Sequence, residues 1–434
     1  MAKTCDIITI IITILLCVKY FKEMVRSSRY IVYFLLVILY IVPIVLDYTI
    51  GLPTYTRVSY SGFNKTYNDE LTRIIYDIAI IFCQIVILRF HRDRIKQDEE
   101  QEQSYNYNAN EYEGQFRLFL IIFMVLPILL TIIFPVNKSI LFSFQWREFG
   151  RFPTDKYTSM LEKFTYPGVV ACALLFFEKR NKVYFRILCI IFMLMNICIE
   201  GKRSILFFLL VTVVLIQIPG LKSNTLSTLE KRRKLILLGV FAIAIIAAIV
   251  IATIFVKINN RGYSLLESDL LYTTIRVDLF RDDRVRMAIY SILHPTEMRI
   301  LDFPGQTILP IPTWFFPIDY ILTKIGIDFP SYQVYFSSAL RGVLVSRDVA
   351  YMTPCLFAEL ISNFGFFGIV IMPFICVGFS NLADRQKYPY NVLVLVSFLA
   401  LQLYTTRYIV YLYEMVLIIF LSKKVKFTFS GNRL

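Results

Sequence analysis

Long apolar runs recur along this chain, and they constrain its fold more than any other feature. A membrane-spanning α-helix needs about 20 predominantly apolar residues, because each residue adds about 1.5 Å of rise. Hydrophobic residues fill 57% of the 434 positions, which is unusual for a soluble domain. We therefore predict an all-α polytopic membrane protein. Its spans, about 11 in number, are placed at 5–18, 30–50, 74–88, 118–135, 164–177, 187–199, 204–219, 235–256, 354–379, 391–406 and 408–422.

Basic residues indicate which ends of these helices face the cytoplasm. Lys and Arg are concentrated in the loops 178–186 and 230–234, and cytoplasmic loops carry an excess of both residues. This pattern favours an amino terminus outside and a carboxyl terminus inside. The net charge of +14 then reflects the Lys and Arg that keep cytoplasmic loops on their side of the membrane lipid, so no nucleic-acid partner is expected.

Three segments follow from the spans and the orientation. Residues 1–256 form a predicted bundle of about 8 transmembrane helices, and residues 354–434 add about three more. Residues 257–353 contain no membrane-length apolar run, and the orientation places them outside the cytoplasm. We expect this outer segment to bear short helices and the chemistry.

Several kinds of site are disfavoured by the composition. The eight cysteines include no C-x-x-C pair, and the chain has only two histidines. A cysteine- or histidine-based metal cluster is therefore not expected. The glycine-rich fingerprints of nucleotide-binding loops are missing as well. We expect neither a metal nor another cofactor.

The stretch RVDLFRDDRVR at 276–286 is the most highly charged part of the outer segment. On a helix beginning near Tyr272, Arg276, Asp283 and Arg284 would share roughly one face. A helix charged nearly all round is either solvated or surrounded by polar partners. One interpretation is an outer-surface helix with internal salt bridges. The other is an anion site, since the guanidinium fork suits phosphate oxygens.

A second basic cluster lies in the tight turn at 200–204. Lys202 and Arg203 fall at the outer membrane face, where the charge bias of cytoplasmic loops does not require them. They either snorkel to the interface or converge with the arginines of 276–286. Convergence would suit a lipid-linked diphosphate, and Arg341, at another outer helix end, is a weaker addition.

The stretch 351–374 combines a carboxylate with closely spaced glycines. Glu359 would lie within two turns of an outer helix end, where it needs a basic partner or a function. Gly365 and Gly368 would allow close packing of helices.

The pattern T-P-x-x-x-x-E-L-x-x-N-F-G-x-x-G at 353–368 resembles bacterial O-antigen polymerases, the Wzy-type oligosaccharide repeat-unit polymerases. The upstream G-K-R and the Arg-rich outer stretch resemble the same family. The resemblance implies a GT-C-like glycosyltransferase of the inner membrane that acts in lipopolysaccharide biosynthesis. Such an enzyme joins undecaprenyl-diphosphate-linked repeat units at the periplasmic face, and a chain-length regulator protein is an expected partner.

That reaction requires two kinds of residue. Fixed cations would neutralise the departing diphosphate, and we assign this role to Arg203, Arg276, Arg281 and Arg284, with Lys202 and Arg341 secondary. A general base would activate the acceptor hydroxyl. The candidates for that base are Asp278, Asp282, His294 and Glu359.

Three alternatives remain open. An O-antigen ligase shares the architecture and differs in its acceptor, which is lipid A core. A flippase for lipid-linked oligosaccharide should carry ionisable residues along a path inside the membrane. Lys and Arg avoid the proposed spans, which disfavours it. The last alternative is a non-catalytic partner in polysaccharide assembly.

Overall fold

The computed structural model is all-helical wherever it describes the chain. It describes residues 1–20, 27–51, 61–89, 114–133, 156–178, 180–200, 204–222, 228–261, 270, 274, 280–300, 325, 332–344, 354–386 and 388–403. Within these ranges there is no β-strand, which confirms the all-α prediction.

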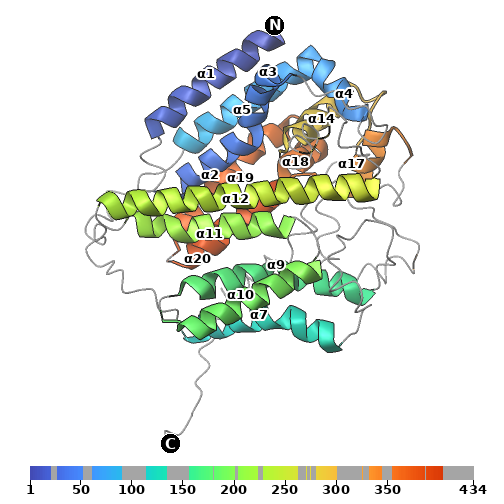
Figure 1. Ribbon diagram of the computed structural model, residues 1–434. Helices are drawn as coiled ribbons and strands as arrows, with labels where there is room; N and C mark the ends of the chain where they lie inside the picture. The colour runs from blue at the N-terminus through green and yellow to red at the C-terminus, as the bar shows by residue number, and fades with distance from the viewer. Residues whose placement is uncertain are drawn as a thin grey trace, which may run out of the picture. The chain divides into compact units, whose positions relative to one another are not determined.

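The chain divides into two compact units. The first unit comprises residues 1–96 and 246–409, and the second comprises 97–245 and 410–434. Figure 1 labels the helices. Those of the first unit are α1 (Ala2–Tyr20), α2 (Ser28–Leu36), the π-helical turn η2 (Val37–Ile41), α3 (Val42–Thr49), α4 (Ser61–Asn68), α5 (Glu70–Arg89), α14 (Asp282–Leu293), α17 (Tyr332–Arg341), α18 (Leu356–Phe364), α19 (Phe367–Asp384) and α20 (Tyr390–Leu403). Those of the second are α7 (Gly114–Ile133), α9 (Lys156–Phe177), α10 (Val183–Glu200) and α11 (Ser204–Lys222), while α12 (Thr228–Arg261) crosses the boundary.

Several helices have the length and composition of membrane spans. Within the described ranges, 4 helical segments qualify: Ser28–Thr49, Glu70–Arg89, Gly114–Ile133 and Phe367–Asp384. Shorter apolar helices occur at Phe164–Phe177, Val183–Ile199, Ile205–Gln217, Ile236–Ile251 and Tyr390–Leu403. The protein is therefore a helical membrane protein. The larger number of spans and the three-segment division remain predictions, and the proposed span 408–422 lies outside the described residues.

Helix α1 has the polarity expected of a helix in lipid. Its buried side includes Asp6, Thr9 and Thr13. Its exposed apolar side chains are Ile7, Ile8, Ile11, Ile14, Leu15 and Val18. A helix packed on a water-soluble domain would bury its apolar stripe instead. The surface of α1 therefore suits hydrocarbon surroundings.

The single span predicted at 354–379 is wrong, because two helices occupy this stretch. Helix α18 ends at Gly365, whose φ of +60° is a backbone conformation that glycine adopts without strain. Gly368 then brings α19 against α18, since a Cβ there would lie 2.4 Å from the carbonyl oxygen of Leu360. The predicted close packing is thus confirmed for Gly368, whereas Gly365 ends a helix.

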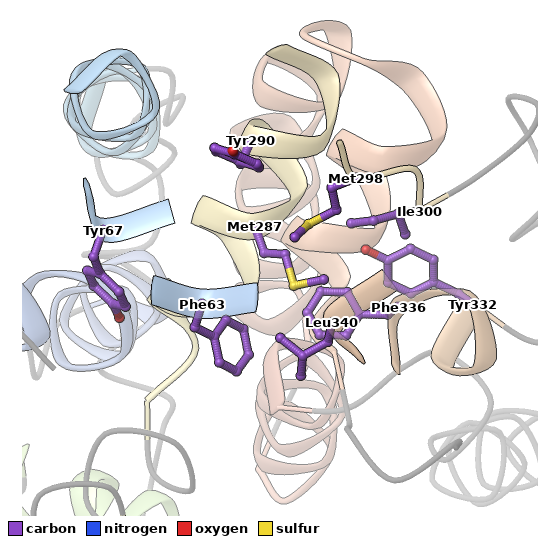
Figure 2. Close-up of a cluster of buried hydrophobic side chains, with 9 residues drawn as sticks. All are labelled: Phe63, Tyr67, Met287, Tyr290, Met298, Ile300, Tyr332, Phe336 and Leu340. Atoms are coloured by element: carbon purple, nitrogen blue, oxygen red, sulfur yellow. The ribbon is translucent and has the colours of Figure 1, made fainter. Parts of the chain in front are cut away.

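An apolar cluster holds α14 between two other helices (Figure 2). Phe63 and Tyr67 come from α4, Met287 and Tyr290 from α14, and Tyr332, Phe336 and Leu340 from α17. Met298 and Ile300, which follow α14 in the chain, complete the cluster. Each fully buried side chain of this size contributes about 1.5–3 kcal/mol, so the cluster fixes the position of α14.

The contact at Gly368 generates a stability prediction. Gly368→Ala should lower stability by about 1–3 kcal/mol, because the new methyl group meets backbone that cannot move aside. Gly378→Ala is the matched control on α19, where a Cβ meets nothing within 4 Å. Thermal unfolding in detergent should show a lower midpoint for the first variant alone. Equal midpoints would contradict the described packing.

Candidate functional site

Helix α14 carries Asp282 and Arg284, lies between Arg281 and His294 in the chain, and is enclosed. It begins at Asp282, with Arg281 at its N-cap, so one continuous helix from near Tyr272 through 286 is interrupted at Phe280 and Arg281. Every residue from Asp282 to Ser291 is buried, which also rules out the interpretation as an outer-surface helix. A helix charged nearly all round can instead be surrounded by polar partners, and α14 is such a helix.

Arg281 joins three parts of the first unit. Its Nε donates to the carbonyl of Leu403 in α20 at 3.0 Å, and its backbone N–H donates to Leu39 at 3.4 Å. The Leu39 carbonyl has no helical donor four residues later, because Pro43 lacks an N–H. Arg281 therefore satisfies a backbone group left open by the π-helical turn.

Arg284 is bound by its neighbours on the same turn. Its Nη1 donates to the carboxylate of Asp283 at 2.5 Å and to the carbonyl of Phe280 at 3.1 Å. The guanidinium also lies over the ring of Phe63, 5.9 Å from its centre. In this conformation, Arg284 is buried and its Nη1 donates to two protein acceptors.

Arg286, which was not among the predicted site residues, is the centre of a buried charge network. It is 1% exposed, and its guanidinium lies 3.5 Å from Asp282 and 3.9 Å from Asp47. It also lies 4.4 Å from the ring centre of Tyr76. Burial would lower the pKa of this guanidinium, but the two carboxylates outweigh burial and raise it. Arg286 is therefore permanently charged.

Glu359 lies on α18, the helix that packs against α14. It is 2% exposed, and its backbone carbonyl accepts from the side chain of Asn363 at 2.7 Å. The motif glutamate and asparagine thus form part of the interior beside the Arg-rich helix.

His294 follows the last residue of α14 and faces Asp69. Its Nε2 lies 3.4 Å from Oδ1 of Asp69, and the two side chains are 34% and 22% exposed. Asp69 also accepts from the backbone N–H of Thr72 at 2.8 Å, at the start of α5. Burial alone would raise the pKa of Asp69, but the bonds from Thr72 and the proximity of His294 lower it. Asp69 is therefore a carboxylate that can orient the imidazole.

Three further polar side chains surround this pair. The ring of Tyr290 lies 4.3 Å from that of His294, and its hydroxyl donates to Glu297 at 2.9 Å. Lys65 forms an ion pair with Glu297 at 3.2 Å. Hydrogen bonds from Tyr290 and Lys65 lower the pKa of Glu297, while burial raises that of Tyr290 to about 12. We call Lys65, Asp69, Tyr290, His294 and Glu297 the His294 cluster.

The candidate residues separate into two places. Arg281, Asp282 and Arg284 meet at the start of α14, with α18 beside the helix. His294 lies ten positions after Arg284, about 15 Å along the helix axis at 1.5 Å per residue. Arg341 is exposed at the end of α17. Lys202, Arg203, Arg276 and Asp278 lie outside the described residues.

Comparison with known proteins identified no relatives. No family model matches the chain, and neither a curated protein nor a solved structure matches it. The resemblance to Wzy-type polymerases therefore remains a prediction from the motifs.

The network around Arg286 generates a second stability prediction. Arg286→Met should cost about 3–5 kcal/mol, because Asp47 and Asp282 then lose a buried positive partner. Arg341→Met at an exposed position should stay within about 0.5 kcal/mol. Unfolding midpoints in detergent measure both variants. An Arg286→Met protein as stable as the native chain would show that the network is dispensable.

Proposed function

We propose that this chain is an O-antigen polymerase of the bacterial inner membrane. It joins undecaprenyl-diphosphate-linked repeat units at the periplasmic face, within a GT-C-like fold of about 11 spans. The packing of α14 against α18 carries the proposal. These helices contain the Arg-rich stretch and the motif glutamate, the two parts of the outer face on which the resemblance depends.

The proposed reaction forms one glycosidic bond and breaks one bond to phosphate. The acceptor hydroxyl oxygen bonds to the anomeric carbon of the donor glycan, and the bond from that carbon to the diphosphate oxygen breaks. Undecaprenyl diphosphate leaves with the electron pair, and the acceptor proton passes to the base. General bases of this kind contribute about 10²–10⁴-fold to a rate.

His294 fits the role of base better than the other described candidates. Asp282 and Glu359 are 0% and 2% exposed, whereas the side chain of His294 is one-third exposed. Because Nε2 lies 3.4 Å from the Asp69 carboxylate, we assign the imidazole hydrogen to Nε2 and the lone pair to Nδ1. Nδ1 is then the atom that accepts the proton.

Arg281 and Arg284 lie at the start of α14, whereas His294 follows its last residue. Nε of Arg281 and Nη1 of Arg284 donate to protein acceptors, about 20 and 15 Å from His294 along the helix. We therefore assign these two arginines to positioning the site. Arg203 and Arg276 keep the predicted diphosphate-binding role, with Lys202 and Arg341 secondary.

One observation favours the flippase as a second candidate. Arg73, just before the proposed span 74–88, lies inside α5 and is buried together with Asp77. It forms an ion pair with Asp6 of α1. Ionisable groups buried between apolar helices are typical of transport pathways. The ligase remains an alternative because only its acceptor differs.

A deletion in the native bacterium tests the proposal directly. The surface glycan should collapse from a ladder to a single repeat unit on lipid A core, because ligation still works. A plasmid copy of the gene should restore the ladder. Polymer left on the lipid carrier would indicate a ligase, and an unchanged ladder would reject both enzymes in favour of transport.

Variants of the His294 cluster test the base. His294→Gln should reduce the polymerisation rate by about 10²–10⁴-fold at equal protein level. Asp69→Asn should also lower the rate, by less than His294→Gln, because the imidazole then lacks the carboxylate that orients it. Glu297→Gln, which leaves the His294–Asp69 pair intact, is the control and should behave like the native protein. An unchanged rate in His294→Gln would exclude this residue as the base.

A further inference from the structure

A buried polar seam runs between α1 and α5 in the first unit. Arg73 forms an ion pair with Asp6, whose other contact is a hydrogen bond from the Tyr48 hydroxyl at 2.7 Å. Farther along both helices, the Gln84 side chain donates to the hydroxyl of Thr13 at 3.0 Å. These contacts fix how the two helices align. Asp77 lies on α5 between the two contact points, Arg73 and Gln84.

Asp77 is the unusual group in this seam. It is 1% exposed, and no hydrogen-bond donor among the described residues reaches either of its oxygens. Oδ1 of Asp6 and the hydroxyl of Thr9 are likewise buried without a hydrogen-bond partner in the described part of the chain. A buried, ionised carboxylate normally accepts several hydrogen bonds. Asp77 lacks the donors that would stabilise its ionised form.

The charges around Asp77 do not balance if both aspartates are ionised. Asp77 lies one helical turn after Arg73 on α5, and Arg73 is the partner of Asp6. Arg286 is already opposed by Asp282 and Asp47. Asp6 and Asp77 thus share the single positive charge of Arg73, which leaves an excess negative charge in a buried, apolar setting. One bound monovalent cation would neutralise it.

We propose that the carboxyl groups of Asp6 and Asp77 form a binding site for one proton, shared between them beside Arg73. A proton needs only two oxygens, and it converts the repulsion of two carboxylates into an O–H···O hydrogen bond. Neither carboxyl belongs to the His294 cluster, so the inference is independent of the proposed polymerase activity. The titratable and charged groups of this region are Asp6 on α1, Asp47 and Tyr48 on α3, Arg73, Tyr76 and Asp77 on α5, and Asp282 and Arg286 on α14.

The shared proton links protonation to the packing of α1. When the proton is bound, Asp6 and Asp77 attract each other across the seam. When it leaves, two carboxylates face each other with one arginine between them, and the contact between α1 and α5 weakens. The site therefore couples proton binding to the attachment of the first helix.

Infrared spectroscopy of the full-length protein in lipid nanodiscs tests the proposal. The native-minus-Asp77→Asn difference spectrum at neutral pH should contain the C=O band of a protonated carboxylic acid, shifted in D₂O. Asp69→Asn is the control and should remove a carboxylate band, because Asp69 has a lowered pKa. Loss of only a carboxylate band in Asp77→Asn would overturn the proposal. A protonated band that appears only after Na⁺ is replaced by choline would also overturn it, because the native cation would then be Na⁺.

Stability measurements give a second, independent readout. Asp77→Asn and Asp6→Asn should each fold with a melting midpoint close to the native one, because an amide resembles the neutral acid that it replaces. The double variant should melt at a clearly lower temperature, since Arg73 then lacks a negative partner. Failure of the Asp77→Asn variant to fold would contradict the proposal, because an ionised Asp77 would then be required.

Discussion

Arg286 makes the interaction on which the rest of the first unit depends. Its guanidinium is fully buried and contacts carboxylates from two helices, Asp47 of α3 and Asp282 of α14. The rings of Tyr67 and Tyr76 cover it. A buried charge is tolerated only with such partners, so these helices cannot separate without a large cost. The position of α14, and of the residues at its two ends, follows from this constraint.

Because α14 is enclosed, its charged side chains bind other parts of the protein and do not face solvent. Arg281, at the start of α14, joins this helix to α20 and to the π-helical turn. At its other end, His294 keeps one-third of its side chain exposed and has a carboxylate partner. A buried, charged helix is therefore followed directly by a partly exposed histidine with a carboxylate neighbour. The apolar outer face of α1 is consistent with hydrocarbon around the unit.

Sequence reasoning found the helices better than it found their contacts. Apolar runs predicted most of the described helices, because length and composition are local properties. The break at Gly365 was missed, since a glycine in an apolar run can either permit close packing or end a helix. The pairs Asp47–Arg286 and Asp69–His294 join residues far apart in the chain, and no local pattern reveals them. Asp6 and Asp77 were overlooked because the argument on spans considered Lys and Arg alone.

The most direct test of the account uses the purified protein in nanodiscs with a synthetic lipid-linked repeat unit. Without added nucleotide, the glycan should lengthen stepwise, and one undecaprenyl diphosphate should be released for each bond formed. The His294→Gln protein should leave the repeat units single. Transfer of glycan only to added lipid A core would contradict the account, as would movement of the lipid-linked unit between leaflets without bond formation.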